Sequence, residues 1–101
     1  MTDNFQNLAK KTLDDIFNIA EKKSPDFDVD FEGENLIIEI DNSTFVLSIH
    51  NPTQQIWMSS PVSGAHHFEY IKEGSNYQWI STRDKSIDLF DKLDMELSSF
   101  L

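Results

Sequence analysis

The hydrophobic pattern of the chain changes from helical to strand-like at a single proline. Over residues 3–23, apolar side chains recur at three- and four-residue spacings, which predicts an amphipathic helix with one buried side. That side comprises Phe5, Leu8, Ala9, Leu13, Ile16, Phe17 and Ala20. Pro25 disfavours helical geometry at Ser24, so we expect the helix to end there.

Residues 26–32 alternate between acidic and apolar side chains, which is the pattern of a half-buried β-strand. Phe27, Val29 and Phe31 would face a core. The other face would carry a row of carboxylates: Asp26, Asp28, Asp30 and Glu32. Neighbours in such a row lie about 6.6 Å apart, because each residue rises about 3.3 Å. Repulsion within the row adds little to folding, so we interpret it as a surface for a metal ion or a basic protein.

Further strand-like segments follow, separated by turn residues about every 8–12 positions, as in an antiparallel meander. They are residues 36–40, 44–49, 54–59, 66–70 and 77–81. A second helix is predicted over about residues 87–100, with Ser86 as its N-cap. Its buried stripe would be Ile87, Phe90, Leu93, Leu97 and Leu101. The order predicts a single α+β domain over residues 1–101, in which two helices cover one face of an antiparallel sheet and water covers the other.

One of these strands places a tryptophan on the open face of the sheet. Ile56 and Met58 share one parity, so burying them exposes the residues of the opposite parity. The exposed set is Gln55, Trp57 and Ser59. Tryptophan is enriched at interface hot spots, which indicates a partner-binding surface. The alternative is that Trp57 lies flat over its neighbours as surface packing.

Composition indicates a folded, acidic protein. Of the 101 residues, 39% are hydrophobic and 12% aromatic, and the formal net charge is −10. Ten acids and two lysines within residues 14–41 carry −8 of that charge. Such a field attracts cations and basic surfaces and excludes nucleic acid and anionic membranes as expected partners. The absence of cysteine excludes thiolate metal sites and thiol nucleophiles.

The segment Gln-Gln-Ile-Trp-Met-Ser-Ser-Pro-Val-Ser-Gly, residues 54–64, resembles the signature of the frataxin family, including its bacterial CyaY members. The likeness extends over nearly the whole chain, through the first helix, the acidic strand, residues 67–70, residues 78–80 and the leucine-rich last helix. It implies a frataxin-like α-β sandwich that binds iron weakly and docks on a cysteine desulfurase and its iron–sulfur scaffold protein. Such a protein would regulate iron–sulfur cluster assembly and would not be an enzyme.

Carried over residue by residue, the resemblance implies two surfaces. The weak Fe²⁺ or Fe³⁺ site would be an acidic ridge of Asp14 and Glu21 on the helix, with Asp15 as an added acid, and Asp26, Asp28, Asp30 and Glu32 on the strand. The partner surface would comprise Asp28, Asp30, Glu32, Gln55, Trp57 and Ser59. Positions that are often acidic in the family are Lys10, Lys11, Asn18 and Lys22 here. We therefore expect the strand to hold iron better than the helix does.

Two other functions would use the same carboxylates. An iron oxidase or iron store would need the buried carboxylate-and-histidine spacing of di-iron proteins, which we do not find in the sequence. A generic acidic interaction module would not discriminate among hard cations. His66 and His67 alternate in parity and do not readily chelate one ion, and His50 reads as a surface residue at a loop edge.

Three further expectations concern location, stability and oligomeric state. Met1 lies almost at the first helix with no presequence, which favours a bacterial cytoplasm over the alternative of a mitochondrial matrix. The chain stops at Leu101, without the tail that longer members pack between their helices, so we expect modest thermal stability. A monomer is expected, with iron-dependent oligomerisation as the alternative.

Overall fold

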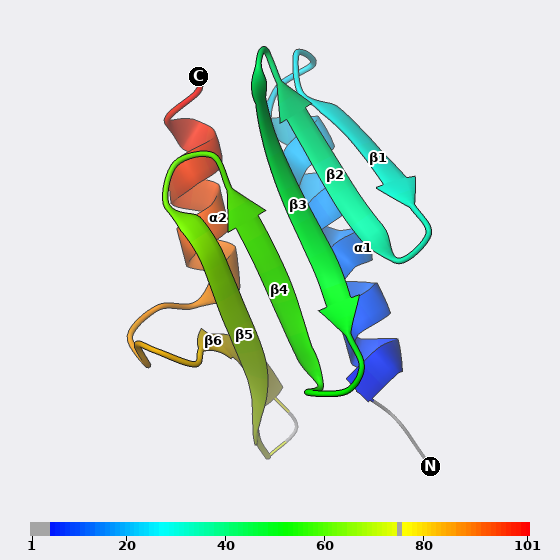
Figure 1. The fold of residues 1–101 in the computed structure, drawn as a ribbon, viewed down its shortest axis with the longest axis vertical. Helices are drawn as coiled ribbons and strands as arrows, with labels where there is room; N and C mark the ends of the chain where they lie inside the picture. Colours follow the sequence, from blue (N-terminus) through cyan, green and yellow to red (C-terminus); the bar gives the residue numbers. More distant parts are fainter. Residues whose placement is uncertain (1–4, 75) are drawn as a thin grey trace.

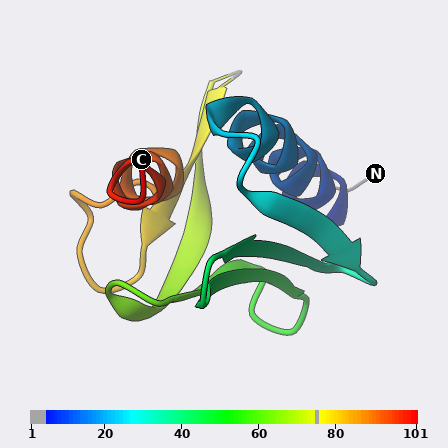
Figure 2. The ribbon, with the colours of Figure 1, turned by 90° about the horizontal axis from the view of Figure 1, so that it is seen from above.

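The computed structural model describes residues 5–74 and 76–101, which form an α-β sandwich (Figure 1). The elements are α1 (Phe5–Lys23), β1 (Asp28–Glu32), β2 (Asn35–Ile40), β3 (Ser43–His50), β4 (Gln55–Ser60), β5 (Gly64–Glu73), β6 (Asn76–Ser81) and α2 (Leu89–Ser98). The strands form one six-stranded antiparallel sheet in the order β1 to β6. Figure 2 shows both helices on one side of the curved sheet, so the predicted fold class is confirmed. Neither helix is long and apolar enough to span a membrane.

The predicted first helix is confirmed from Phe5 onward, while residues 3 and 4 lie outside the described part of the chain. The acidic strand is shorter than predicted, because β1 begins only at Asp28. The preceding residues form a turn in which the backbone N–H groups of Asp26 and Phe27 donate to the Ser24 side chain and carbonyl. The prediction that Asp26 belongs to the strand is therefore wrong.

The second helix begins at Leu89 and has Asp88, not Ser86, as its N-cap. Asp88 Oδ2 accepts a hydrogen bond of 3.1 Å from the Asp91 N–H, whereas the Ser86 hydroxyl donates to Asp84 Oδ1 in the turn before the helix. The helix ends at Ser98, so Leu101 lies beyond it and is 70% exposed instead of buried as predicted. Leu89, Leu93 and Leu97 form the apolar part of the buried stripe, and Ile87 and Phe90 pack at its margin.

The core lies between the sheet and the helices and contains one polar contact that joins α1 to β6. Trp79 is fully buried, and its Nε1–H donates to Thr12 Oγ1 at 2.8 Å. The Thr12 hydroxyl in turn donates to the Leu8 carbonyl, also at 2.8 Å. Thr12 is therefore buried because it accepts the indole proton, although the hydrophobic pattern of the helix did not include it.

A buried carboxylate joins α2 to the loop between β4 and β5. Glu96 is 3% exposed, and its two oxygens accept hydrogen bonds of 2.6 Å from the Ser60 and Ser63 hydroxyls. Lys92 Nζ lies 3.2 Å from Glu96 Oε2. The Ser60 oxygen also accepts the backbone N–H groups of Val62 and Ser63. The serines of the signature segment thus hold this loop against the last helix.

Candidate functional site

The acids of β1 form an exposed row at the edge of the sheet. Asp28, Asp30 and Glu32 are exposed on the open face, while Val29 between them packs against the core. The antiparallel register pairs Asp28 with Glu39 of β2, which adds a fourth carboxylate to this face. Glu39 is not among the site residues predicted from the sequence; it joins the row because the two-residue turn at Gly33 and Glu34 determines the register. We call Asp28, Asp30, Glu32 and Glu39 the acidic row.

The acids of α1 are more dispersed. Asp14 and Glu21 are exposed, and Asp15 forms an ion pair with Lys11 at 3.2 Å. Asp14 lines a cleft of about 220 Å³ between α1 and the β1–β2 turn, together with Glu34 and Phe31. Within residues 5–74 and 76–101, no three acids or histidines are close enough to hold one metal ion together. The arrangement therefore offers an ion one or two carboxylates at a time, with water as the remaining ligands.

Phe31 is not the core residue that its alternation predicted. It is 37% exposed, because β1 lies at the sheet edge and only α1 covers its inner face there. Its ring stacks on Phe17 with centroids 5.4 Å apart and an angle of 6° between the rings. This pair attaches α1 to β1, which lie on the same side of the molecule (Figure 1).

Trp57 lies on the open face, as the parity of its strand predicted, while Ile56 and Met58 are buried beneath it. The indole is stacked between two imidazoles, with centroids 3.7 Å from His50 and 4.3 Å from His67. Its Nε1–H donates to Gln55 Oε1 at 2.7 Å. Trp57 is thus packed flat against its neighbours, as the alternative prediction described, and its orientation on the face is determined by them.

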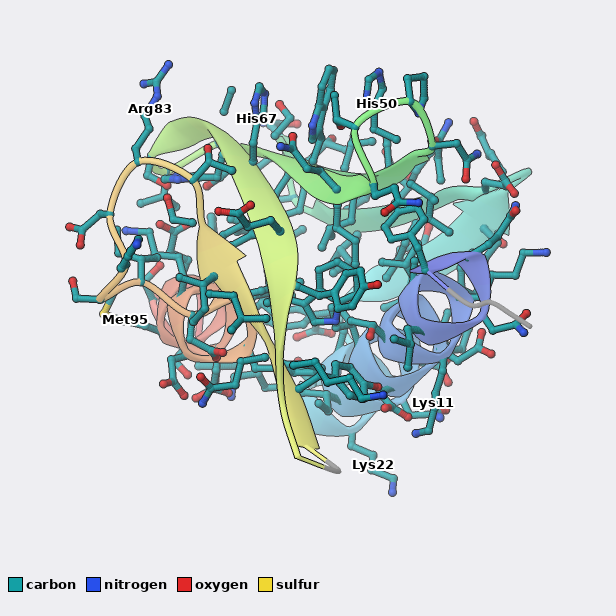
Figure 3. All side chains as sticks on the ribbon, turned by 90° about the horizontal axis from the view of Figure 1, so that it is seen from below. Lys11, Lys22, His50, His67, Arg83 and Met95 are labelled. Atoms are coloured by element: carbon teal, nitrogen blue, oxygen red, sulfur yellow. The ribbon has the colours of Figure 1, made fainter. Side chains whose placement is uncertain are left out.

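The two histidines of this stack come from the strands on either side of Trp57. His50 is the last residue of β3, next to the loop as predicted, and it is half-buried because its ring packs on Trp57. Figure 3 shows His50 and His67 projecting from the side of the sheet opposite the helices. The stack could have been predicted only from the register of the β3–β4 hairpin. That register pairs His50 with Gln55 and so places His50 diagonally opposite Trp57.

The acidic row and the tryptophan share one face. The register carries Glu32 through Asn35 and Ser48 to Trp57, so three strand spacings of about 4.8 Å place them about 14 Å apart. A parallel row on the same face runs from Asp30 through half-buried Ile37 and Val46 to exposed Ser59. The open face therefore combines carboxylates, a small apolar strip and a rigid aromatic group.

His66 points to the other face of β5, beside Met58, and contacts the Glu96 network. Its Nε2 lies 2.8 Å from the Ser63 oxygen. Because the single Ser63 proton is donated to Glu96, the His66 Nε2 carries the proton in this contact. Burial of the imidazole, followed by the positive charge of Lys92, lowers the pKa of His66 below its ordinary value. Burial acts to raise the pKa of Glu96, but hydrogen bonds from Ser60, Ser63 and Lys92 outweigh it and lower that pKa.

Acid is expected to destabilise the protein in two ranges of pH. Because folding lowers the pKa of His66, the unfolded chain binds its proton more readily, and stability declines as the pH falls below about 6.5. Glu96 contributes fully above about pH 4.5 and loses its contribution as the pH falls through its lowered pKa. Melting temperatures measured from pH 8 to pH 3 should decline in both ranges. The first decline should disappear in His66→Gln and persist in His67→Gln; a flat profile between pH 7 and pH 5 would contradict this.

Known proteins share both the sequence and the fold. The family model described as a Frataxin-like domain matches residues 1–101. The mitochondrial frataxin homolog of Schizosaccharomyces pombe is 31% identical over 86 residues, covering 84% of this chain and 52% of that protein. Mitochondrial frataxin of Arabidopsis thaliana is 32% identical over 101 residues, covering 94% of this chain and 52% of that protein. The chain thus spans about half the length of these relatives.

Solved structures lead to the same assignment. The crystal structure of trimeric frataxin from the yeast Saccharomyces cerevisiae, complexed with ferrous iron, superposes with a TM-score of 0.77 at 28% identity and covers 91% of this chain and 83% of that chain. Frataxin from Psychromonas ingrahamii, at 21% identity, covers 92% of this chain and 87% of that chain with a TM-score of 0.66, which shows a shared fold. With the family model matched from end to end, the chain belongs to the frataxin family.

Proposed function

We propose that this protein is a non-enzymatic, iron-binding adaptor of iron–sulfur cluster assembly that docks on a cysteine desulfurase and its scaffold protein. The observation that supports this most directly is the open face, where the acidic row and Trp57 lie about 14 Å apart on one side of a rigid sheet. Membership of the frataxin family makes iron–sulfur cluster assembly the process in which such a face would be used.

The chemistry of the face indicates the kind of partner that fits it. Lysine or arginine side chains would meet Asp28, Asp30, Glu32 and Glu39, and apolar side chains would cover Ile37 and Val46. Because Trp57 is held by two stacking contacts and one hydrogen bond, it would lose little conformational entropy on binding. We propose Gln55 and Ser59, on the same side of β4, as flanking polar contacts.

Iron would be a cargo held weakly by the same edge of the molecule. Carboxylate oxygens are hard ligands that suit iron and discriminate poorly among hard cations. We propose Asp28, Asp30 and Glu32 as the main ligands and Asp14, Asp15, Glu21 and Asp26 as secondary ones, because Asp15 is occupied by Lys11 and Asp26 lies outside the strand. The yeast structure with ferrous iron supports iron binding in this fold.

The relatives also bear on location and assembly. The proteins of S. pombe, A. thaliana and Leishmania donovani are described as mitochondrial, which supports the mitochondrial alternative over the bacterial cytoplasm that we predicted. The trimeric yeast frataxins support oligomerisation as an alternative to the predicted monomer. Both properties are proposals for this chain.

Reversing the charge of β1 should abolish binding to the desulfurase. The double substitution Asp28→Lys and Asp30→Lys replaces two exposed carboxylates with ammonium groups, which would repel a basic partner. The fold should survive, because both positions are exposed. Binding is measured by calorimetry with a purified cysteine desulfurase at low and high salt. A matched control, Asp14→Lys with Glu21→Lys, changes the net charge equally on α1 and should retain most of the affinity.

Three results would argue against this function. Desulfurase binding that survives both β1 substitutions and Trp57→Ala would exclude the open face as the docking surface. Equal affinity for Fe²⁺, Mg²⁺ and Ca²⁺, together with no desulfurase complex, would instead indicate a generic acidic interaction module. Catalytic oxidation of Fe²⁺ with a defined turnover rate would indicate an iron oxidase.

A further inference from the structure

A polar hollow lies at the end of the sheet farthest from the acidic row. It has a volume of about 240 Å³ and is formed by β5, the end of β6 and the loop that leads to α2. Its lining residues are Ser63, Ala65, His66, His67, Ser81, Arg83, Asp84 and Ile87. The His66 imidazole, the Arg83 guanidinium and the Ser81 hydroxyl thus border one cavity and are donors suited to an anion, while His67 reaches the cavity from the opposite face of β5.

The hollow contains an arginine in a strongly acidic protein. Arg83 is the only arginine of a chain with 18 acids, and no carboxylate of the described residues forms an ion pair with it. Figure 3 shows Arg83 and His67 on the same side of the molecule, and both residues line the hollow.

The acidic groups near the hollow are already occupied by local donors. Glu96 accepts hydrogen bonds from two serines and from Lys92. Asp84 lines the hollow, and one of its two carboxylate oxygens, Oδ1, accepts both the backbone N–H and the hydroxyl of Ser86. These contacts reduce the repulsion that either carboxylate would exert on an incoming anion.

One hydroxyl of the lining is available as a donor. The Ser81 oxygen accepts the backbone N–H groups of Arg83 and Asp84, at 3.2 and 3.3 Å. Both of its accepting positions are therefore filled, and its single proton remains for a ligand. Ser81 is 4% exposed and stands at the end of β6, so its position relative to His66 and Arg83 is determined by the sheet.

We propose that this hollow binds a small oxyanion, a phosphate or a carboxylate group. Arg83 would supply the charge at the rim, Ser81 would supply a hydrogen bond, and the His66 imidazole would take up a proton as the anion enters. The hollow is larger than a bare phosphate requires, so a polycarboxylate such as citrate and a phosphate are both candidate sources of the anion. The proposal does not depend on iron binding or on the desulfurase.

Nuclear magnetic resonance titration of the full chain tests it. Inorganic phosphate and citrate are added separately at pH 6.5, with sodium chloride at the same ionic strength as the reference. We expect saturable shifts of the His66 and His67 ring protons and of the Arg83 amide with at least one of the two anions, and none with chloride. The anion that saturates at the lower concentration identifies the preferred source.

Matched variants determine whether the hollow is the site. Arg83→Gln should weaken the binding about tenfold or more, because it removes a charge-assisted contact. Lys85→Gln removes the same charge from an exposed neighbour that does not line the hollow, and it should leave the affinity within about twofold. Equal weakening by both variants, or shifts that never saturate, would overturn the proposal in favour of a diffuse charge effect.

A second readout is the protonation of His66. A bound anion favours the imidazolium, so saturating phosphate or citrate should raise the pKa of His66 in the parent protein and not in Arg83→Gln. A His66 pKa that is the same with and without the anion would contradict the proposed position of the ligand. Because Arg83 is exposed, circular dichroism is expected to show an unchanged fold for its variant.

Discussion

Replacing Glu96 with glutamine is expected to lower the free energy of unfolding by about 3 kcal/mol. The site requires a group that only accepts hydrogen bonds. An amide NH₂ in the place of Oε2 would face the Lys92 ammonium, which is another donor. In the place of Oε1 it would face the Ser60 oxygen, whose accepting positions are filled by Val62 and Ser63. Either orientation therefore puts a donor where the site has an acceptor, and at least one hydrogen bond to the carboxylate is lost.

The loss is measured by urea denaturation at pH 7 and compared with Asp91→Asn, which removes a charge from an exposed position of the same helix. We expect the control to change stability by no more than about 0.5 kcal/mol. The loop at residues 61–63 should also become more accessible to protease in Glu96→Gln. Wild-type stability in Glu96→Gln would mean that the carboxylate is not an obligatory acceptor.

Thr12→Val is expected to cost about 1–3 kcal/mol, although the substitution conserves shape and adds an apolar group to the core. Valine removes the acceptor of the Trp79 Nε1–H, which is fully buried between α1 and β6. The indole proton would then have no partner, and the desolvation of this donor would no longer be compensated. Thr12→Ser keeps the hydroxyl and should lose less.

A double-mutant cycle separates this hydrogen bond from packing. Trp79→Phe removes the N–H along with part of the ring, so Thr12→Val should cost less in the Trp79→Phe background than in the parent protein. We expect a coupling energy of about 1 kcal/mol, measured by denaturation followed with circular dichroism. Additive effects of the two substitutions would show that Thr12 contributes through its volume alone.

The local patterns of the chain predict much of the fold, because each depends on a period that one segment carries by itself. The three- and four-residue spacing predicts α1, and the alternation in residues 55–59 correctly places Trp57 opposite Ile56 and Met58. Predictions at the ends of elements were less accurate. Ser86 and Asp88 are both suitable N-cap residues by type. Asp88 is the N-cap because the Ser86 hydroxyl is bound to Asp84 in the preceding turn.

The sequence by itself determined the α+β architecture, the acidic face of β1 and the side of the sheet that carries Trp57. These follow from periodicity, which a residue shares with its neighbours in the chain. Only the tertiary structure decided that Glu39 joins the acidic row, that His50 and His67 enclose Trp57, and that Glu96 is buried beneath the signature loop. Each of these depends on strand register or on helix packing between residues far apart in the chain, and hydrophobic periodicity contains no information on such pairings.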